Sequence, residues 1–493
     1  MDKAVLVLDC GATNVRAVAV GANGSLLASR SLPNMVRPDP DFEGGLIWDV
    51  EEIWQKLCAC SRHVISSLQD TAIGAVTATT FGVDGAPMLK NGTLCHPVIS
   101  WQCSRTVPVM NAIGKYIDPA GLSAITGLQP YHYNTINKLV WFRENRWDVL
   151  RVMKSYVMMP SIFLHRMTGE FVTDTTMAGT TMLTNVKSRK FSDIILEAIG
   201  IGTKIFPPLV EPGTVVGKIR ASAAKDLGID PGIPVVATGH DTQFAVFGSG
   251  AGINEPVLSS GTWEILMSRT PAESINIPPV SEGVTCEFDA VPGLIDLGVQ
   301  WVASGVLEWI TALFYGEYKD SPSRYQLMIE EAQAIPAGCC GVTMLPELFD
   351  GGFIPSKGCI NGLRHDTSRA QIYRAALEAL AYYTRTGLEI LKKAGAFTPG
   401  SLLGVGGGTK NRLWNQIRAD VLQMPFKVSN RSETTVLGAA LFAMPAAGLY
   451  HSVEEAVLSV ENRVETFLPG AGTGAYQQLY SDFRANWLPE SNL

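Results

Sequence analysis

Two stretches far apart in the chain share one pattern, in which an apolar run, a bend of small polar residues and a second apolar run follow one another. The first is KAVLVLDCGATNVRAVAV, starting at Lys3, and the second is EPVLSSGTWEILMS, starting at Glu255. Each pattern predicts two β-strands joined by a tight turn. The first pair continues through Asn23-Gly24, a strong hairpin signal, into a third strand.

Helical periodicity follows both stretches. Apolar residues recur at helical spacing over residues 51–69, and a strand, IGAVTATTF, comes next. In the second half, residues 373–393 predict a long helix, SLLGVGGGTKN a strand that enters a glycine turn, and residues 412–423 a further helix. Strands that alternate with helices predict an α/β layer architecture. We expect two domains, residues 1–248 and 249–493, divided at the glycine-rich stretch that begins at Gly248.

Charge and composition limit the kinds of partner. The 493 residues carry a formal net charge of −7, and lysine and arginine form no basic stripe, which argues against nucleic acid or an anionic membrane as a partner. The opening MDKAVLVLDCG has too short an apolar run for a signal peptide, and residues 436–449 are too short to span a bilayer. Nine cysteines without a metal-like CxxC pair predict reduced, mostly buried thiols in a cytoplasmic protein.

The two bends are candidate phosphate loops. Gly11 to Asn14 offer backbone N–H groups together with hydroxyl and amide donors, which suit phosphate oxygens. Asp9, at the end of the preceding strand, is placed to hold Mg²⁺ through a hard oxygen ligand. The bend Ser259-Ser260-Gly261-Thr262 repeats the theme. Each bend alone is also compatible with an ordinary hairpin, but two in one chain favour a clamp for phosphates.

The glycine run GVGGGTKN is neither a Walker loop nor a GxGxxG dinucleotide motif. Three glycines after a strand let the backbone approach a flat or bulky group, such as adenosine. The alternative is a close crossing of a strand and a helix.

The pair His240-Asp241 follows an apolar run at a turn. A metal site would need further ligands nearby, and a hydrolase triad would need a GxSxG elbow, which the chain lacks. A carboxylate close to phosphate loops fits a general base that takes a proton from an alcohol during phosphoryl transfer. The alternative is an aspartate that caps the helix DTQFAVF.

These motifs follow one another along the chain: Asp9 to Asn14 with Arg16, Gly239-His240-Asp241, Ser260-Gly261-Thr262, and Gly406 to Gly408 with Asn411. Two longer signatures, YNTINKLVWFREN (133–145) and GCINGLRHDTSRAQIYRAALE (358–378), accompany them. Together they resemble the FGGY family of carbohydrate kinases, and the resemblance covers nearly the whole chain in order.

The resemblance implies a fold and an activity. The fold is α/β, with two ribonuclease-H-like domains as in the actin-like ATPases and a cleft between them for nucleotide and sugar. The first domain supplies the sugar and phosphate side and the second the adenosine side. The activity is transfer of phosphate from ATP to the primary hydroxyl of a sugar, with Mg²⁺ as cofactor.

By similarity, Asp241 is the general base and Asp9 the carboxylate that organises Mg²⁺. The ATP-binding candidates are Gly11, Thr13, Asn14, Arg16, Thr262, Gly407, Gly408 and Asn411. The substrate-binding candidates are Gly82, Asp84, Trp101, Arg105, His240 and Gln243. Among these, we expect Asp84 to bind sugar hydroxyls and Trp101 to contact the apolar face of the sugar.

Within the family, TTFGVDGA, ISWQCSRT and GHDTQFAVFG are most similar to members that convert L-fuculose to L-fuculose 1-phosphate. Many relatives carry an aspartate in a Trp-x-Asp-x-Arg stretch, where this chain has Cys103. The change removes a charged sugar contact and fits a deoxy sugar. L-rhamnulose, D-ribulose and xylulose remain alternative substrates, since a methyl in place of a hydroxymethyl group shifts discrimination by only about 1–3 kcal/mol.

An actin-like or chaperone-like ATPase is the alternative from another class, because this fold hosts both activities. His240-Asp241 beside polar sugar-side residues favours the kinase, and an intact base and two intact phosphate loops disfavour a silent sugar sensor. The sequence leaves self-association into a homo-oligomer open.

Overall fold

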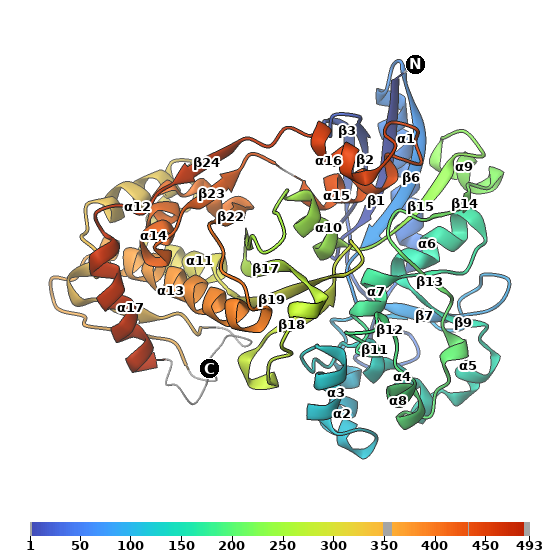
Figure 1. Ribbon diagram of the computed structural model, residues 1–493, viewed down its shortest axis with the longest axis horizontal. Helices are drawn as coiled ribbons and strands as arrows, with labels where there is room; N and C mark the ends of the chain where they lie inside the picture. The colour runs from blue at the N-terminus through green and yellow to red at the C-terminus, as the bar shows by residue number, and fades with distance from the viewer. Residues whose placement is uncertain (1, 349–356, 432, 488–493) are drawn as a thin grey trace. The chain divides into compact units, whose positions relative to one another are not determined.

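The computed structural model describes residues 2–348, 357–431 and 433–487 (Figure 1). The chain forms two compact units. The first comprises residues 1–250, 286–296 and 433–461, and the second comprises residues 251–285, 297–432 and 462–493. The first unit therefore takes segments from both sides of residue 248, whereas the second unit lies entirely after it, and the predicted domain boundary there stays a prediction.

A mixed sheet forms the centre of the first unit. Among the described residues its strand order is β14-β15-β6-β1-β2-β3. The bounds are β1 Asp2–Cys10, β2 Asn14–Gly21, β3 Leu26–Pro33, β6 Thr71–Thr80, β14 Val215–Lys218 and β15 Pro234–His240. β1, β2 and β3 form an antiparallel meander, which confirms the three strands expected at the start of the chain.

The central strands β1, β6 and β15 run parallel. Asp9 of β1 pairs with Thr79 of β6, and His240 of β15 pairs with Thr80 on the other side of β6. The carboxyl ends of these strands consequently meet at one edge of the sheet, where ligands of open α/β sheets bind. Asp9 and the His240-Asp241 turn are thus one strand apart.

Helices cover both faces of this sheet. Successive side chains of β1 point to opposite faces and are apolar on both, so each face needs a covering layer. Leu6 and Leu8 pack in the core with α1 (Val50–Ser67), α6 (Met159–Thr168) and α9 (Ala221–Leu227). Val5 and Val7 pack in the core with α10 (Asp241–Gly248), α15 (Thr434–Ala443) and α16 (Val453–Ser459). The helix predicted over residues 51–69 is α1.

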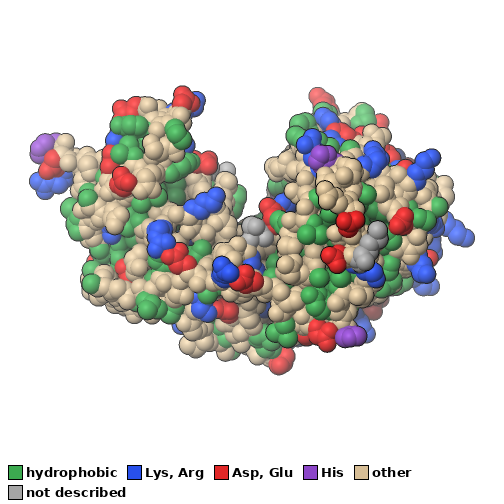
Figure 2. Space-filling view, turned by 90° about the horizontal axis from the view of Figure 1, so that it is seen from above, with side chains coloured by type: hydrophobic (Ala, Val, Ile, Leu, Met, Phe, Trp, Pro, Cys, Tyr) green, Lys and Arg blue, Asp and Glu red, His purple; other side chains and the backbone are tan. Residues whose placement is uncertain are grey.

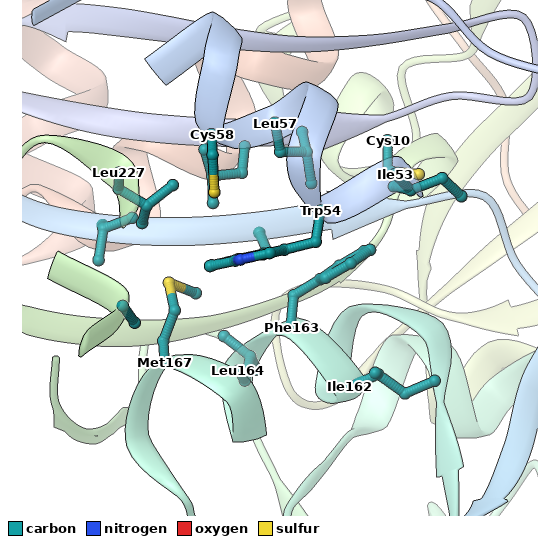
Figure 3. Close-up of a cluster of buried hydrophobic side chains, with 14 of the residues drawn as sticks. Cys10, Ile53, Trp54, Leu57, Cys58, Ile162, Phe163, Leu164, Met167 and Leu227 are labelled. Atoms are coloured by element: carbon teal, nitrogen blue, oxygen red, sulfur yellow. The ribbon is translucent and has the colours of Figure 1, made fainter. Parts of the chain in front are cut away.

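The core under α1 is shown in Figure 3. Trp54 of α1 stacks on Phe163 of α6, with ring centroids 6.2 Å apart and planes inclined by 19°. Cys10, at the end of β1, lies in the same cluster. The strand end that carries Asp9 is therefore anchored by close packing.

The rest of the first unit consists of short elements between β3 and β14. The strands are β4 Arg37–Pro38, β5 Leu46–Trp48, β7 Gly85–Met88, β8 Val98–Ile99, β9 Ser155–Met158, β10 Thr173–Asp174, β11 Thr184–Asn185, β12 Lys190–Phe191 and β13 Leu209–Val210. The helices are α2 Val107–Asn111, α3 Pro119–Thr126, α4 Thr135–Asn145, α5 Trp147–Val152, α7 Thr175–Gly179 and α8 Asp193–Ala198. Many of them share a separate core around α4.

A second sheet has the order β18-β19-β17-β16-β22-β23-β24 within the described residues. Its bounds are β16 Val257–Ser260, β17 Trp263–Pro271, β18 Thr285–Phe288, β19 Leu294–Val302, β22 Leu402–Val405, β23 Phe426–Ser429 and β24 Val464–Phe467. β16, β22 and β23 run parallel, and β16 and β17 form the second predicted hairpin. Residues 286–296, from β18 into β19, belong to the first unit.

The second unit also contains β20 Thr343–Leu345, β21 Cys359–Asn361, α11 Ser304–Phe314, α12 Arg324–Gln333, α13 Arg369–Gly395, α14 Arg412–Leu422 and α17 Thr473–Trp487. The long helix predicted over residues 373–393 is α13, which starts earlier because Ser368 and Gln371 form a capping box. The helix predicted over residues 412–423 is α14.

The surface and the thiols bear on the expected partners. Lysine and arginine side chains are interspersed with aspartate and glutamate on the face shown in Figure 2. All nine cysteines are free and six are buried, which confirms the prediction of unpaired, mostly buried thiols. No helix in the described part of the chain is long and apolar enough to cross a membrane.

Candidate active site

The His240-Asp241 turn joins the end of β15 to the start of α10. Asp241 is the first residue of α10 and His240 precedes it, so Asp241 does not occupy the capping position that the alternative interpretation requires. The Asp241 side chain is 28% exposed, and its Oδ1 lies 3.4 Å from His240 Nε2. Burial raises the pKa of Asp241, and the nearby His240 opposes this shift. A partly exposed carboxylate at a strand end can accept a proton from a bound ligand.

A series of buried hydrogen bonds holds the backbone of this turn. The His240 backbone N–H donates to Thr176 Oγ1 over 2.9 Å, and Thr176 Oγ1 donates to Asp174 Oδ1. A Cβ at Gly239 would lie 2.0 Å from Asp174 Oδ1, so only glycine fits there. The glycine of the predicted Gly239-His240-Asp241 motif is thus explained by a close approach of the backbone to a carboxylate.

Glu287 of β18 completes the surroundings of His240, and sequence reasoning missed it. Its Oε2 lies 3.4 Å from His240 Nδ1 and accepts a hydrogen bond from Gln243 Nε2. The predicted residues His240 and Gln243 are therefore brought together by a carboxylate from a distant strand. No motif surrounds Glu287 in CEFDAVPG, and only its spatial neighbours reveal it.

A pocket of about 490 Å³ in the first unit contains the first predicted phosphate loop. It is lined by the candidates Asp9, Gly11, Thr13, Asn14 and Arg16, together with residues of β2 and β3 and Glu433. Their backbone and side-chain donors therefore share one cavity, as the prediction requires.

Asp9 is tied to Arg16 within this pocket. Arg16 Nε donates to Asp9 Oδ2 over 2.6 Å, and Arg16 Nη1 pairs with Glu433 Oε2. Burial raises the pKa of Asp9 to about 6, although Arg16 opposes the shift. Glu433, which precedes α15, was also missed by sequence reasoning.

The donor set of the pocket fits Mg²⁺. Mg²⁺ prefers oxygen ligands and is held in kinases by one or two carboxylates together with phosphates. Asp9 supplies such a carboxylate next to the predicted phosphate loop. Among the described residues no three His, Cys, Asp or Glu side chains form a metal site of their own, so a nucleotide would have to supply further ligands.

The sugar-side candidates divide into two groups. Gly82 lies against His240, since a Cβ there would be 2.8 Å from His240 Nε2. Asp84, in contrast, is fully buried and accepts from Trp48 Nε1 over 2.6 Å, from the Trp101 backbone N–H over 3.0 Å and from Lys138 Nζ. In this structure Asp84 fixes the main chain at Trp101.

Arg105 is likewise engaged by the protein. Its side chain is fully buried, pairs with Asp39 over 2.5 Å and stacks on Phe42 and Trp141. Cys103, which replaces the aspartate of many relatives, accepts from Arg105 Nε over 3.1 Å. The roles of Asp84 and Arg105 as direct sugar ligands stay predictions, and their contacts favour a supporting role.

Trp101 lies in an aromatic group. Its ring meets the edge of Tyr133 at 6.3 Å, and Tyr133 stacks on Tyr131 at 4.9 Å. Tyr133 also lies near enough to Glu287 for that carboxylate to contribute to its raised pKa, after burial. An apolar aromatic wall therefore stands close to the His240 cluster.

The second unit holds the remaining ATP candidates. A Cβ at Gly406 would lie 2.6 Å from the Ser260 carbonyl oxygen, and one at Gly408 would lie 2.1 Å from Ser260 Oγ. These two glycines are thus required by close packing on Ser260 of the second predicted phosphate loop. A Cβ at Gly407 meets no described atom within 4 Å, and this position stays open for a ligand.

Thr262 and Asn411 also make structural contacts. The Thr262 carbonyl accepts from the Ala303 backbone N–H over 2.9 Å, and a phosphate contact of its hydroxyl stays a prediction. Asn411 Oδ1 caps α14 by accepting from the Trp414 backbone N–H over 3.1 Å. Its Nδ2 donates to Tyr373 Oη over 3.2 Å, so a role toward adenosine stays a prediction.

Comparison with known proteins places the chain in a family. The model for the N-terminal domain of the FGGY family of carbohydrate kinases matches residues 4–248, and the model for its C-terminal domain matches residues 257–447. L-fuculokinase from Escherichia coli strain K12 is 44% identical over 472 residues, which cover 95% of this chain and 98% of that protein. L-fuculokinase from Haemophilus influenzae is 43% identical over 458 residues, which cover 92% and 96%.

A solved structure agrees in fold. Xylulose kinase from Rhodospirillum rubrum superposes with a TM-score of 0.89 at 23% identity, covering 98% of each chain. This similarity extends over both sheets, and the predicted actin-like ATPase fold is confirmed. The family-domain matches and the relatives span nearly the whole chain, and the chain therefore belongs to the FGGY family of carbohydrate kinases.

Proposed function

We propose that this protein transfers the γ-phosphate of ATP to the primary hydroxyl of L-fuculose, which yields L-fuculose 1-phosphate and ADP. The geometry that carries the proposal is the shared sheet edge, where Asp241 lies one strand away from the Asp9 pocket. The choice of sugar rests on the relatives named L-fuculokinase that match almost all of the chain.

Asp241 acts as the general base in this proposal. A sugar hydroxyl is a weak acid, so its proton leaves late, as the phosphoryl group arrives. The base must therefore be ionised and within hydrogen-bond reach, without a strongly raised pKa. The partial exposure of Asp241 at the start of α10 meets the need for access.

The phosphates bind in the pocket of the first unit. Backbone N–H groups of the Gly11–Asn14 turn and the Arg16 guanidinium supply donors for phosphate oxygens, and Asp9 would hold Mg²⁺. Bound Mg²⁺ would offset the charge of the phosphates. Thr262, Gly407, Gly408 and Asn411 are the proposed contacts of ATP in the second unit.

The sugar binds beside His240 and Gln243, with the aromatic wall of Trp101 and Tyr133 against its apolar side. A 6-deoxy sugar presents a methyl group to such a wall, and burying one methyl group contributes about 1 kcal/mol. Cys103 fits this interpretation, because its thiol is engaged with Arg105 where many relatives carry a charge.

The test is release of ADP from Mg-ATP with L-fuculose, L-rhamnulose, D-ribulose, D-xylulose and glycerol, each at several concentrations. L-fuculose should give the highest kcat/KM, and ADP release without sugar should be slow. Asp241→Asn should lose about 10²–10⁴-fold in kcat. Asp193→Asn is the matched control, because Asp193 is also the first residue of a helix in the same unit and should leave kcat unchanged.

Two results would count against the proposal. If another ketose gives the highest kcat/KM while Asp241→Asn is inactive, the mechanism stands and the substrate is wrong. If no sugar stimulates ADP release, the protein is not a kinase of this panel, and an ATPase that changes conformation has to be reconsidered.

A further inference from the structure

His240 lies between two carboxylates that belong to different parts of the chain. Asp241 Oδ1 is 3.4 Å from His240 Nε2 on one side, and Glu287 Oε2 is 3.4 Å from His240 Nδ1 on the other. All three residues belong to the first unit. The order Glu287, His240, Asp241 therefore ends on the proposed base.

The ring of His240 is held in this orientation. Its side chain is only 14% exposed, its backbone is fixed by Thr176, and Gly82 packs directly against the ring edge at Nε2. Gln243 holds the Glu287 carboxylate by donating to Oε2. Packing on several sides therefore keeps each ring nitrogen within ion-pair distance of one carboxylate.

This arrangement specifies a protonation state. A carboxylate can only accept hydrogen bonds, and a neutral imidazole has one N–H, whereas an imidazolium has two. A ring with a carboxylate at each nitrogen is best satisfied as the imidazolium. In agreement, the pKa of His240 is raised although burial lowers it, because Glu287 and Asp241 stabilise the charged ring.

The titratable groups named below surround the cluster of Glu287, His240 and Asp241. They are acidic or neutral at pH 7, and the two cations among them are paired with other acids. Arg16 pairs with Asp9, and Lys138 pairs with Asp84. The surrounding acids and neutral groups are Asp9 and Cys10 of β1, Asp84, Tyr133, Asp174 of β10 and Cys286 of β18. The charge on His240 is therefore the one placed directly between Asp241 and Glu287.

We propose that Glu287 is a positioning residue that keeps His240 as an imidazolium, and that His240 in turn keeps Asp241 ionised for the proton of the substrate hydroxyl. The catalytic part of this inference rests on the proposed kinase function. The protonation of His240 does not, and it can be measured in the free protein.

The direct test follows the imidazole nitrogens by NMR in protein labelled with ¹⁵N-histidine, without nucleotide or Mg²⁺. The chain has seven histidines, and His240→Gln identifies the His240 signals by their loss. In the unaltered protein, His240 should stay protonated well above the ordinary midpoint of about 6.5. In Glu287→Gln its midpoint should fall by about one pH unit or more, a roughly tenfold change in proton affinity.

The second test is the pH profile of kcat with saturating sugar and Mg-ATP. If Glu287→Gln leaves His240 neutral, Asp241 loses its neighbouring cation and the acidic limb of the profile moves to higher pH. Removing the charge of Glu287 while His240 stays protonated would move the limb to lower pH, because Glu287 itself raises the pKa of Asp241. The direction of the movement therefore decides between the two cases.

Three variants guard against a merely structural effect. Glu287→Asp should restore part of the His240 titration. In the double variant with His240→Gln, Glu287→Gln should no longer move the acidic limb to higher pH, since that effect passes through His240, and only the direct effect of the lost Glu287 charge, toward lower pH, should remain. Glu51→Gln is the matched control, because it breaks an ion pair with Arg166 in the same unit and should leave the limb in place.

The outcomes separate the two proposals. If the titration of His240 is unchanged in Glu287→Gln, or the acidic limb moves to lower pH, the inference is overturned. If the titration shifts as expected but no sugar is phosphorylated by the unaltered protein, the coupling of Glu287 and His240 stands and the proposed function is wrong.

Discussion

A buried ion pair beneath the second phosphate loop allows a quantitative prediction. Glu264 and Arg418 are both fully buried and pair directly. Glu264 also accepts from Ser260 Oγ over 2.8 Å and from Trp301 Nε1 over 3.0 Å, while Arg418 stacks on Trp414 at 3.6 Å. Ser260 begins the Ser260-Gly261-Thr262 bend, so the pair connects the stability of the unit to the shape of the loop.

Replacing Glu264 and replacing Arg418 should lower the free energy of unfolding by different amounts. Glu264→Gln leaves Arg418 charged and buried without its anion, and arginine cannot release its proton in a protein. Breaking a buried pair in this way costs about 3–5 kcal/mol of the free energy of unfolding.

Arg418→Met, in contrast, leaves a carboxylate that can take up a proton. With an ordinary pKa of about 4.3 and about 1.4 kcal/mol per unit, protonation of the buried Glu264 costs at most about 4 kcal/mol at pH 7 and about 1 kcal/mol at pH 5. Raising the pKa of a carboxyl in the folded state means that stability is lost as pH rises. Arg418→Met should therefore be distinctly more stable, relative to the unaltered protein, at pH 5 than at pH 7.

The assay is hydrogen exchange of the amides of β16 and α14 at the two pH values, corrected for the intrinsic rates, since exchange reports the free energy of local opening. The double variant Glu264→Gln with Arg418→Met keeps the acceptor for Ser260 and removes both charges, and it should be more stable than Glu264→Gln alone. If Glu264→Gln and Arg418→Met lose equal stability with equal pH dependence, the reasoning is refuted.

Three further predictions concern the first unit. Burial raises the pKa of Asp174 to about 6, so the free energy of unfolding should fall by up to about 3 kcal/mol as pH rises from about 4 to about 6, and urea denaturation of Asp174→Asn should show this dependence flattened. Gly239→Ala should abolish kcat, since its Cβ would lie 2.0 Å from Asp174, whereas Gly114→Ala, where nothing lies within 4 Å, should be neutral in the same assay. Arg105→Lys should lower the free energy of unfolding by about 1–3 kcal/mol, because the bidentate-capable bond to Asp39 and the aromatic stacking are lost, and it should leave the KM for sugar unchanged. An altered KM with unchanged stability would instead support Arg105 as a sugar ligand.

The elements that the sequence predicts are those whose partners lie nearby in the chain. The hairpins around Gly11 and Gly261 and the helix α1 follow from alternation and helical spacing, which local contacts impose. The position of Asp9 near His240 does not follow from local pattern, because β1 and β15 are distant in the chain and are brought together only by pairing with β6. The same holds for Asp84, since Lys138 and Trp48, which bury its charge, lie far from it in sequence.

Glu287 is a second residue whose role depends on partners that are distant in the sequence. A glutamate in a short strand carries no signal until the chain returns it to the His240-Asp241 turn, and a lone acidic residue is far more often a solvated surface group. The triple glycine shows that a motif can have two causes at once, since Gly406 and Gly408 pack on Ser260 whereas Gly407 has open space.

The three carboxylates at the sheet edge are distinguished by how many of their oxygens the protein uses. Among contacts of the described residues, Asp84 receives donors on both oxygens, from Lys138 on one and from Trp48 and Trp101 on the other, and it is fully buried. These contacts favour a supporting role for Asp84, and its role as a direct sugar ligand stays a prediction.

Asp9 and Asp241 each use one oxygen in the same set of contacts, toward Arg16 and toward His240 and Thr242. Each therefore keeps an oxygen for an incoming group, while its cationic neighbour offsets the cost of holding the charge in a partly buried site. Placed one strand apart, the two acids can serve different ligands without sharing a proton, one toward the phosphates and the other toward the hydroxyl that attacks them. In the proposed function the phosphoryl donor and acceptor meet at the end of β6, and the two functions fall to two separate carboxylates.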